Sequence, residues 1–338
     1  MSKQFKFTIN HHLVNKLSVN QYSLPINGSF TISRGSKTHA DVVVVTLEPA
    51  NGAVGYGESV PYARYGESIE QVMADLAALD IDAIQLTPER IATLLPAGAA
   101  RNALDCAWWD LHCKQNKQNI WQLLELSPCV QTTAFTLSLD SAEKMGQAAY
   151  QNRHRPLLKL KLAGEGDIER VAAVRKNAPD SQLIVDANEG WNVEIYQRMI
   201  PQLVELNVLM IEQPFPADKD EWLDGLPRPI TICADESCHD AASLAKLVGR
   251  FDMINIKLDK TGGLTEALKL KQAAIEQGLK ILVGCMVGSS LGMAPAFVVA
   301  QGADIVDLDG PLLLAQDCDH GFEFEGSSMQ VMSEDLWG

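Results

Sequence analysis

Two patterns in the sequence predict an α/β fold in which an α+β module precedes a barrel of the (β/α)7β type. After Thr132, short apolar segments rich in β-branched residues alternate with segments of helical periodicity. Before residue 127 the pattern of predicted elements differs, because strand-like segments come first and helical segments follow. With 338 residues, the chain is long enough for such a barrel and an accessory domain.

The accessory module is expected to cover residues 1–126. It begins with the strand-like segments FKFTINHHL, SFTISRG and ADVVVVTLEP, and Asn51-Gly52 predicts a hairpin turn into AVGYGES. Residues 68–126 then show helical spacing, interrupted by Pro88 and Pro96. Because the active sites of α/β barrels lie at the carboxyl ends of the strands, we expect this module to cap that end and contribute substrate contacts.

Eight strand-like segments predict a closed barrel over residues 127–315. In chain order they are TTAFTLSL, LLKLKL, QLIVDAN, VLMIEQP, PITICAD, MINIKL, KILVGC and IVDLDG. Helical segments lie between them, for example residues 167–177 and 264–277. After the eighth segment Gly310-Pro311 ends the pattern and no long helix follows, which predicts a modified TIM barrel, (β/α)7β. The tail, residues 316–338, is expected to return to the capping module.

Composition narrows the classes of partner. The sequence has no apolar run long enough to span a membrane, and its net charge of −15 disfavours nucleic acid, which requires clustered Lys and Arg. The beginning MSKQFKFTIN lacks the apolar stretch of a secretory signal, and the seven cysteines form no CxxC pair. We therefore expect a cytoplasmic protein with reduced thiols and a small-molecule substrate; a homo-oligomer stays open.

Two lysines share one face of the second predicted barrel strand. In LLKLKL the side chains alternate, so Lys159 and Lys161 point into the barrel while the leucines point outward. Two buried ammonium groups are costly unless anions lie beside them. This predicts carboxylates, or an anionic substrate, at the same height.

Three carboxylates follow the next three strands directly. Asp186, Glu212 and Asp235 end the segments QLIVD, VLMIE and PITICAD. Like charges at one barrel mouth repel each other unless a cation neutralises them, and oxygen ligands suit Mg²⁺. The sequence therefore predicts one Mg²⁺ site per subunit.

A third lysine, Lys257, lies in the sixth strand segment, MINIKL. Strands two and six are four apart in an eight-stranded barrel, so Lys161 and Lys257 should approach the centre from opposite sides. Two such groups can remove a proton from one face of a substrate carbon and return one to the other face. This arrangement indicates a racemase or epimerase.

Together the segments KLK, DAN, IEQP, ADES and NIKLDKTGG resemble the muconate-lactonizing subgroup of the enolase superfamily. Such a resemblance implies that Lys161 and Lys257 are the acid/base pair, that Asp186, Glu212 and Asp235 bind Mg²⁺, and that Lys159 assists the substrate carboxylate.

Further segments, namely SRGSKT, PYARYGES, PAGAARNALDCAWWDL, CADESCH and DLDGP, resemble the dipeptide epimerases of the L-Ala-D/L-Glu type. This resemblance implies that two aspartates bind the ammonium group of the dipeptide. In this sequence they are Asp307 and Asp309, which should lie two residues apart on one strand. Arg34, with Arg64 as a second candidate, would take the glutamate side chain. The positions that match the rest of the family's substrate site are Thr136, Cys285 and Met286.

Three alternatives remain at this point. A dipeptide epimerase with another side-chain preference, and an o-succinylbenzoate synthase or cycloisomerase, would use the same lysines and metal. A non-catalytic binding protein would be expected to have lost a ligand or a base, whereas this sequence keeps all five.

Overall fold

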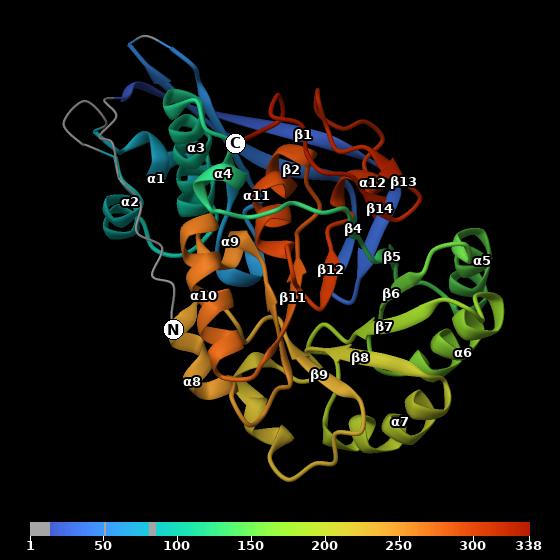
Figure 1. Cartoon of the computed structure of the whole chain (residues 1–338). Helices are drawn as coiled ribbons and strands as arrows, with labels where there is room; N and C mark the ends of the chain where they lie inside the picture. Colours follow the sequence, from blue (N-terminus) through green and yellow to red (C-terminus); the bar gives the residue numbers. More distant parts are fainter. Residues whose placement is uncertain (1–13, 51, 81–85) are drawn as a thin grey trace.

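A computed structural model describes residues 14–50, 52–80 and 86–338 and shows an α/β barrel with a second module against it (Figure 1). The predicted strand FKFTINHHL, residues 5–13, and Asn51 of the predicted hairpin turn lie outside the described residues. The α/β class and the barrel with its N-terminal cap are confirmed.

The cap contains an antiparallel sheet in the order β1-β2-β3, with β1 at Val14–Ile32, β2 at Gly35–Pro49 and β3 at Gly55–Ser59. β1 and β2 form one long hairpin whose register shifts between Pro25 and Phe30. SFTISRG, which we expected as one strand, instead supplies the end of β1, the turn at Ser33-Arg34 and the first residue of β2. This turn carries Arg34 at the tip of the hairpin.

Four α-helices pack beside this sheet: α1 at Ile69–Ala77, α2 at Pro88–Leu94, α3 at Ala99–Asn116 and α4 at Ile120–Leu123, preceded by the 3-10 helix η1 at Ala63–Tyr65. The side chain of Ser68 caps α1 by accepting a hydrogen bond from Gln71 N. The side chain of Thr87 caps α2 in the same way, by accepting one from Arg90 N. Helix α3 packs directly on β3, where a Cβ at Gly57 would overlap the backbone of Ala103.

Eight parallel strands form the barrel, and they neighbour one another in chain order. An isolated bridge between Thr133 and Val306 joins the first of them to the last. The strands are β5 Phe135–Leu137, β6 Leu157–Lys161, β7 Gln182–Asp186, β8 Val208–Glu212, β9 Thr231–Ala234, β10 Met253–Ile256, β11 Lys280–Gly284 and β12 Ile305–Asp307. All eight predicted strands are therefore present.

Helices on the outside connect the strands (Figure 1). The helix predicted at 167–177 coincides with α6, and the one predicted at 264–277 is one residue longer than α10. Between β8 and β9 the connection is a 3-10 helix, η3, and after β12 only four residues are helical. The elements are α5 Ala142–Asn152, α6 Asp167–Asn177, α7 Val193–Glu205, η3 Ala217–Leu223, η4 Ala241–Ser243, α8 Leu244–Leu247, α9 Leu258–Thr261, α10 Leu264–Glu276, α11 Ser290–Ala300 and α12 Gly310–Leu313.

The tip of the β1–β2 hairpin reaches the mouth of the barrel. Leu139 N, just after β5, donates a hydrogen bond to Thr31 O at 2.9 Å, and Ile26 forms an isolated bridge with Leu314 after β12. In Figure 1 the blue hairpin runs from the cap helices toward β5. Residues at its tip are thereby held next to the carboxyl ends of the barrel strands.

The tail contacts both parts of the chain. Strands β13, Phe324–Glu325, and β14, Ser328–Met329, pair with β4, Gln131–Thr132, at the start of the barrel. Farther on, Trp337 Nε1 donates to Tyr56 O at 3.1 Å and Gly338 N donates to Asp110 Oδ1 at 2.8 Å, both in the cap. The division at residues 126 and 315 itself stays a prediction.

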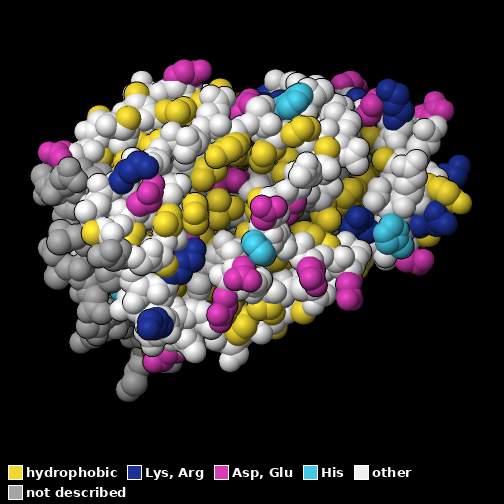
Figure 2. Space-filling view, turned by 90° about the horizontal axis from the view of Figure 1, so that it is seen from above, with side chains coloured by type: hydrophobic (Ala, Val, Ile, Leu, Met, Phe, Trp, Pro, Cys, Tyr) yellow, Lys and Arg dark blue, Asp and Glu magenta, His cyan; other side chains and the backbone are white. Residues whose placement is uncertain are grey.

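The surface carries charges of both signs. On the face seen in Figure 2, from the side of β1 and β2, acidic side chains lie among hydrophobic ones and the basic ones are scattered. Within the part of the chain that the structure describes, no helix combines the length and the apolar character needed to cross a membrane.

Candidate active site

A cavity of about 510 Å³ opens between the barrel mouth and the cap. Its size suits a small molecule and excludes a folded partner. Of the predicted site residues, its lining includes Arg34, Thr136, Lys159, Lys161, Asp235, Lys257, Cys285, Met286, Asp307 and Asp309. The structure therefore brings these residues, drawn from seven separate segments, to one place.

Strand β6 presents both of its lysines to the inside of the barrel. Leu158 and Leu160 are fully buried on the opposite face, within the main hydrophobic core. Lys159 and Lys161 are buried as well, and Lys159 is paired in register with Thr136 of β5. This is the alternation that the sequence LLKLKL predicts.

The three predicted metal ligands meet at the floor of the barrel mouth. Asp186 and Glu212 are the last residues of β7 and β8 and lie in register, and Asp235 directly follows β9. One oxygen of each lies within 4.8 Å of the others, and all three side chains are buried. Because parallel strands end at the same height, neighbouring strand ends can bring three ligands this close.

This cluster fits a hard divalent cation. It consists of carboxylate oxygens only, the donor set that Mg²⁺ prefers. Glu212 Oε2 is buried and has no hydrogen bond of good geometry, although Lys159 Nζ lies 2.6 Å away. Beside this ion pair, the buried oxygen keeps lone pairs that a metal ion can use. Asp186, Glu212 and Asp235 are therefore the residues that can hold a metal.

Each carboxylate also has a donor of its own. Lys161 Nζ donates to Asp186 Oδ2 at 2.6 Å, and Lys257 Nζ donates to Asp235 Oδ2 at 2.7 Å. Strands β6 and β10 are separated in the sheet by β7, β8 and β9. Lys161 and Lys257 thus reach the carboxylate cluster from different sides.

The pKa values follow from this pairing. Burial alone would lower the pKa of Lys257, but Asp235 and Glu212 raise it well above its ordinary value. Burial would raise the pKa of Asp235, yet Lys257 and Lys260 hold it well below its usual range. The floor of the site is therefore a network of paired opposite charges.

Two residues of this network were not predicted. Lys260 Nζ donates to Asp235 Oδ1 at 2.7 Å, and Asn255 Nδ2 donates to Glu212 Oε1 at 2.7 Å. Both orient a carboxylate of the cluster from outside the cavity. Asn255 lies two residues before Lys257 on β10, and this shared strand face is the signal that could have identified it.

Asp307 and Asp309 both line the cavity, but they are not on one strand as predicted. β12 ends at Asp307, and Asp309 is the N-cap residue directly before the short helix α12, with φ −86° and ψ 4°. The chain leaves the extended conformation here because Pro311 in the first turn favours helix. Asp307 Oδ2 pairs with Lys159 at 2.7 Å, whereas its Oδ1 is buried without a hydrogen-bond partner.

Asp309 is held by the neighbouring strand β5. Its Oδ2 accepts a hydrogen bond from Thr136 N on β5 at 2.6 Å. Burial and the neighbouring Asp307 raise the pKa of Asp309 to about 6. Two close, buried carboxyl groups with incomplete partners form a site for a cation such as an ammonium group.

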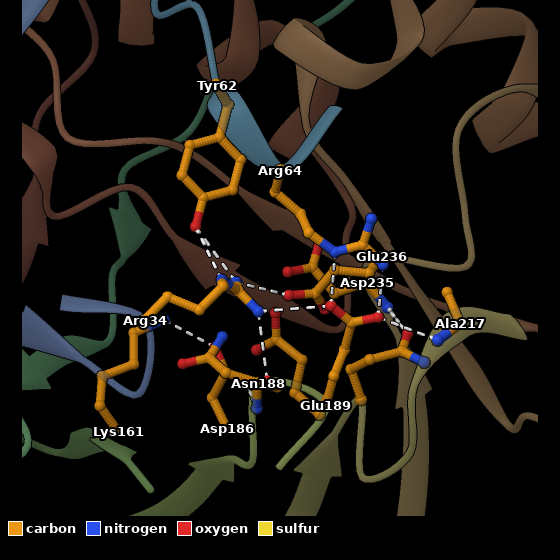
Figure 3. A network of polar contacts seen from close by, with 12 residues as sticks. Arg34, Tyr62, Arg64, Lys161, Asp186, Asn188, Glu189, Ala217, Asp235 and Glu236 are labelled. Carbon is orange, nitrogen blue, oxygen red and sulfur yellow. Dashed lines mark hydrogen bonds and ion pairs between the residues drawn. The ribbon is translucent and has the colours of Figure 1, made fainter. Parts of the chain in front are cut away.

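Arg34 occupies the cap side of the cavity, where it is engaged by five hydrogen bonds (Figure 3). Its Nε and Nη2 donate to Tyr62 Oη at 3.2 and 3.1 Å. Nη2 also donates to Glu236 Oε1 at 2.8 Å. Nη1 donates to Asn188 O at 3.2 Å and to Glu189 Oε2 at 3.3 Å. We call this group of residues, together with Arg64, the cap-side corner.

Arg64, the second candidate for the substrate side chain, is bound to Glu189. Its Nε and Nη2 donate to the two carboxylate oxygens at 2.7 and 2.6 Å, and Ala217 N adds a third donor at 2.9 Å. Glu189 has a φ of +66°, in the left-handed region that non-glycine residues rarely adopt. Glu189, Glu236 and Tyr62 were not predicted as site residues, although Glu236 and Tyr62 lie within the segments CADESCH and PYARYGES and Glu189 directly follows DAN.

Two family models cover most of the chain. The model described as "Mandelate racemase / muconate lactonizing enzyme, N-terminal domain" matches residues 16–125, and the one described as "Enolase C-terminal domain-like" matches residues 141–334.

Characterised relatives match over nearly the full length. An N-acetyl-D-glutamate racemase from Pseudoalteromonas sp. is 46% identical over 287 residues, 84% of this chain and 91% of the relative. An L-Ala-D/L-Glu epimerase from Escherichia coli (strain K12) is 42% identical over 312 residues, 91% and 97% of the two chains. One relative is thus named a racemase and the other an epimerase, and both names contain glutamate.

Solved structures match as well. An enolase family member from Agrobacterium tumefaciens with homology to dipeptide epimerases, with sodium and L-Ala-L-Glu bound, gives a TM-score of 0.92 at 49% identity and covers 95% of this chain and 99% of its own. A dipeptide epimerase from Enterococcus faecalis V583, complexed with Mg and L-Leu-L-Tyr, gives a TM-score of 0.88 at 29% identity. The match covers 96% of this chain and 99% of that chain. These matches confirm the resemblance, and the chain belongs to the mandelate racemase/muconate lactonizing enzyme family of the enolase superfamily.

Proposed function

We propose that this protein is a Mg²⁺-dependent isomerase that epimerises L-Ala-L-Glu to L-Ala-D-Glu. The observation that carries the proposal is the placement of Lys161 and Lys257, which reach a cluster of three buried carboxylates from different sides of one small cavity. The similarity to an L-Ala-D/L-Glu epimerase at 42% identity supports the substrate class.

The two lysines exchange one proton at the α-carbon of the glutamate residue. A cation held by the carboxylates would lower the pKa of the lysines that pair with them, so that one amine can be neutral. This amine takes the α-proton and becomes an ammonium group, leaving a planar enediolate. The ammonium group on the other face then donates its proton to the same carbon, which inverts the configuration. Asp186, Glu212 and Asp235 would hold Mg²⁺, which would supply positive charge to the substrate carboxylate.

Other residues hold the two ends of the dipeptide. Lys159 assists the α-carboxylate, and Asp307 with Asp309 takes the alanine ammonium group, for which Asp307 Oδ1 keeps an unused lone pair. Arg34 faces the glutamate side chain. The remaining wall of the site consists of Thr136, Cys285 and Met286.

Racemisation of an N-acylated glutamate is the second candidate. The relative at 46% identity is named an N-acetyl-D-glutamate racemase. This substrate carries the same two carboxylates but lacks the ammonium group. The aspartate pair favours the dipeptide, because two buried carboxyl groups gain more from a cation than from an acetyl group.

A substrate screen tests both candidates. The enzyme is incubated with Mg²⁺ in D₂O with each L-Ala-L-Xaa dipeptide and with N-acetyl-L-glutamate, and deuterium uptake at the α-carbon is measured by mass spectrometry. We expect the highest kcat/KM for L-Ala-L-Glu. A preference for N-acetylglutamate would replace the dipeptide assignment, and a preference for Ala-Leu or Ala-Lys would refute the glutamate assignment. No exchange with any substrate would refute the isomerase.

The setting we propose is the cytoplasm, where the dipeptide would come from peptidoglycan recycling or peptide catabolism. All seven cysteines are free, as suits a reducing compartment. A homo-oligomer is compatible with this proposal, and analytical ultracentrifugation of the full chain tests it.

A further inference from the structure

The donors of Arg34 are already in use. A guanidinium group has five N–H donors, and the five contacts to Tyr62, Glu236, Asn188 and Glu189 match that number. A substrate carboxylate that binds Arg34 must therefore displace one of these acceptors. Arg34 by itself does not provide a free hydrogen-bond donor.

In the cap-side corner each guanidinium group is paired with one carboxylate, and burial raises the pKa of one of these carboxylates, Glu236, to about 7. Arg34 pairs with Glu236 at 2.8 Å, and Arg64 pairs with Glu189 at 2.6 Å. Two guanidinium groups and two carboxylates in contact have no net charge when all are ionised. Attraction of an acidic side chain to this corner consequently depends on the individual donors that point into the cavity.

The hydroxyl of Tyr62 is such a donor. It lines the cavity, and its oxygen accepts two hydrogen bonds from Arg34, which occupy both lone pairs. Its own proton has no acceptor among residues 14–50, 52–80 and 86–338. Edge contact with the ring of Tyr65, at 5.5 Å between centroids, fixes the ring. In Figure 3 the hydroxyl points from the cap toward Arg34, with Lys161 and Asp186 beyond it.

We propose that Tyr62 is a specificity-determining residue whose O–H donates a hydrogen bond to the side-chain carboxylate of the substrate. Arg34 polarises this hydroxyl through its two N–H donors and orients the proton into the cavity. A phenol that donates to a carboxylate makes a short, charge-assisted hydrogen bond, which a neutral side chain cannot match. This inference rests on the proposed function and adds the residue that recognises the acidic side chain of the substrate.

The test compares Tyr62→Phe with the wild type on three dipeptides. L-Ala-L-Glu offers a carboxylate, L-Ala-L-Gln offers a neutral oxygen in the same place, and L-Ala-L-Met offers neither. We expect Tyr62→Phe to lower kcat/KM roughly ten- to hundredfold for Ala-Glu, less for Ala-Gln and hardly at all for Ala-Met. Retained turnover of Ala-Met shows that the variant is folded. N-acetyl-L-glutamate has the same side chain and should lose as much as Ala-Glu.

A double-mutant cycle separates direct donation from an effect through Arg34. In an Arg34→Met background, Tyr62→Phe should still lower kcat/KM for Ala-Glu severalfold, because the hydroxyl itself contacts the substrate. Tyr150→Phe is the matched control, since Tyr150 also contacts an arginine, Arg153, at 3.9 Å but lies on the exposed surface. We expect it to change no kcat/KM.

Three outcomes would overturn the inference. One is an equal loss for Ala-Glu and Ala-Met, and another is the disappearance of the Tyr62→Phe effect in the Arg34→Met background. Both leave the proposed function intact, because the wild type still exchanges the α-proton of acidic substrates. The third is a wild type that exchanges only neutral dipeptides, which refutes the acidic substrate and Tyr62 together while the isomerase chemistry survives.

Discussion

The floor and the cap-side corner of the cavity are both built from ion pairs, but they differ in origin. The floor carboxylates and lysines lie in the barrel strands or directly after them and are all buried. The arginines of the corner come from cap loops, and their side chains remain 28% and 37% exposed at Arg34 and Arg64. The floor is fixed by the barrel itself, whereas the corner depends on how the cap is docked.

This difference separates reaction from recognition. Strand ends hold the floor groups with little freedom, as a proton transfer requires. Loops can change residue by residue without disturbing the barrel, so they suit the recognition of variable side chains. Changes in the floor should therefore affect every substrate, and changes in the corner should affect acidic ones selectively.

Metal removal should have the largest effect. Chelation with EDTA should abolish turnover of all substrates, because Asp186, Glu212 and Asp235 then have no cation to present to the substrate carboxylate. Addition of Mg²⁺ should restore turnover in the wild type, and much less in Glu212→Gln at the same concentration. Full activity of a metal-free preparation would exclude the metal site.

Replacement of either catalytic lysine should have the second-largest effect on turnover. Lys161→Ala and Lys257→Ala should each lower epimerisation by at least about 10²–10⁴-fold for acidic and neutral dipeptides alike. In D₂O, each variant should exchange the α-proton of one epimer only, as followed by NMR. Lys144→Ala, at an exposed lysine on α5, is the control. A variant that exchanged both epimers would contradict the two-base arrangement.

Glu58 joins the cap to the barrel and should give a smaller, pH-dependent effect. It accepts a hydrogen bond from Ser289 N at 2.8 Å, and burial raises its pKa from 4.5 to about 7. Because the folded-state pKa is the higher one, its stabilising contribution is complete below pH 4.5 and is lost as the pH rises through 7.

Glu58→Gln should remove that dependence. The free energy of unfolding of the wild type relative to this variant should fall by up to about 3 kcal/mol between pH 4.5 and 7, as measured by urea denaturation. Glu143→Gln, at an exposed position, is the control. A difference that stayed constant with pH would show that Glu58 is ionised throughout.

Arg64→Met should have the smallest effect. Two of the five N–H donors of Arg64 bind the carboxylate of Glu189, which already offsets its charge. We therefore expect the substrate preference to stay the same and the free energy of unfolding to change by at most about 1 kcal/mol, as for a partly exposed ion pair. A selective loss of Ala-Glu turnover would mean that Arg64, rather than Tyr62 and Arg34, faces the substrate.

Much of the floor could be predicted because strand periodicity is local. Alternation in LLKLKL determines that Lys159 and Lys161 share a face, and an acidic residue at the end of three successive apolar segments fixes their common height. Asp309 shows the limit of this reasoning. Its prediction extended the strand two residues too far, since Pro311 starts a helix that side-chain alternation does not reveal.

The sequence by itself determined the barrel, the order of its strands and the residues at their carboxyl ends, because each of these depends on neighbours within a few positions. Only the tertiary structure decided what the cap residues do. Arg34 lies more than 150 positions from Asn188, Glu189 and Glu236, which take three of its five donors, and Tyr62 takes the other two. The hydroxyl proton of Tyr62 is left free for the same reason, since contacts between distant loops follow from docking and have no periodic signal in the sequence.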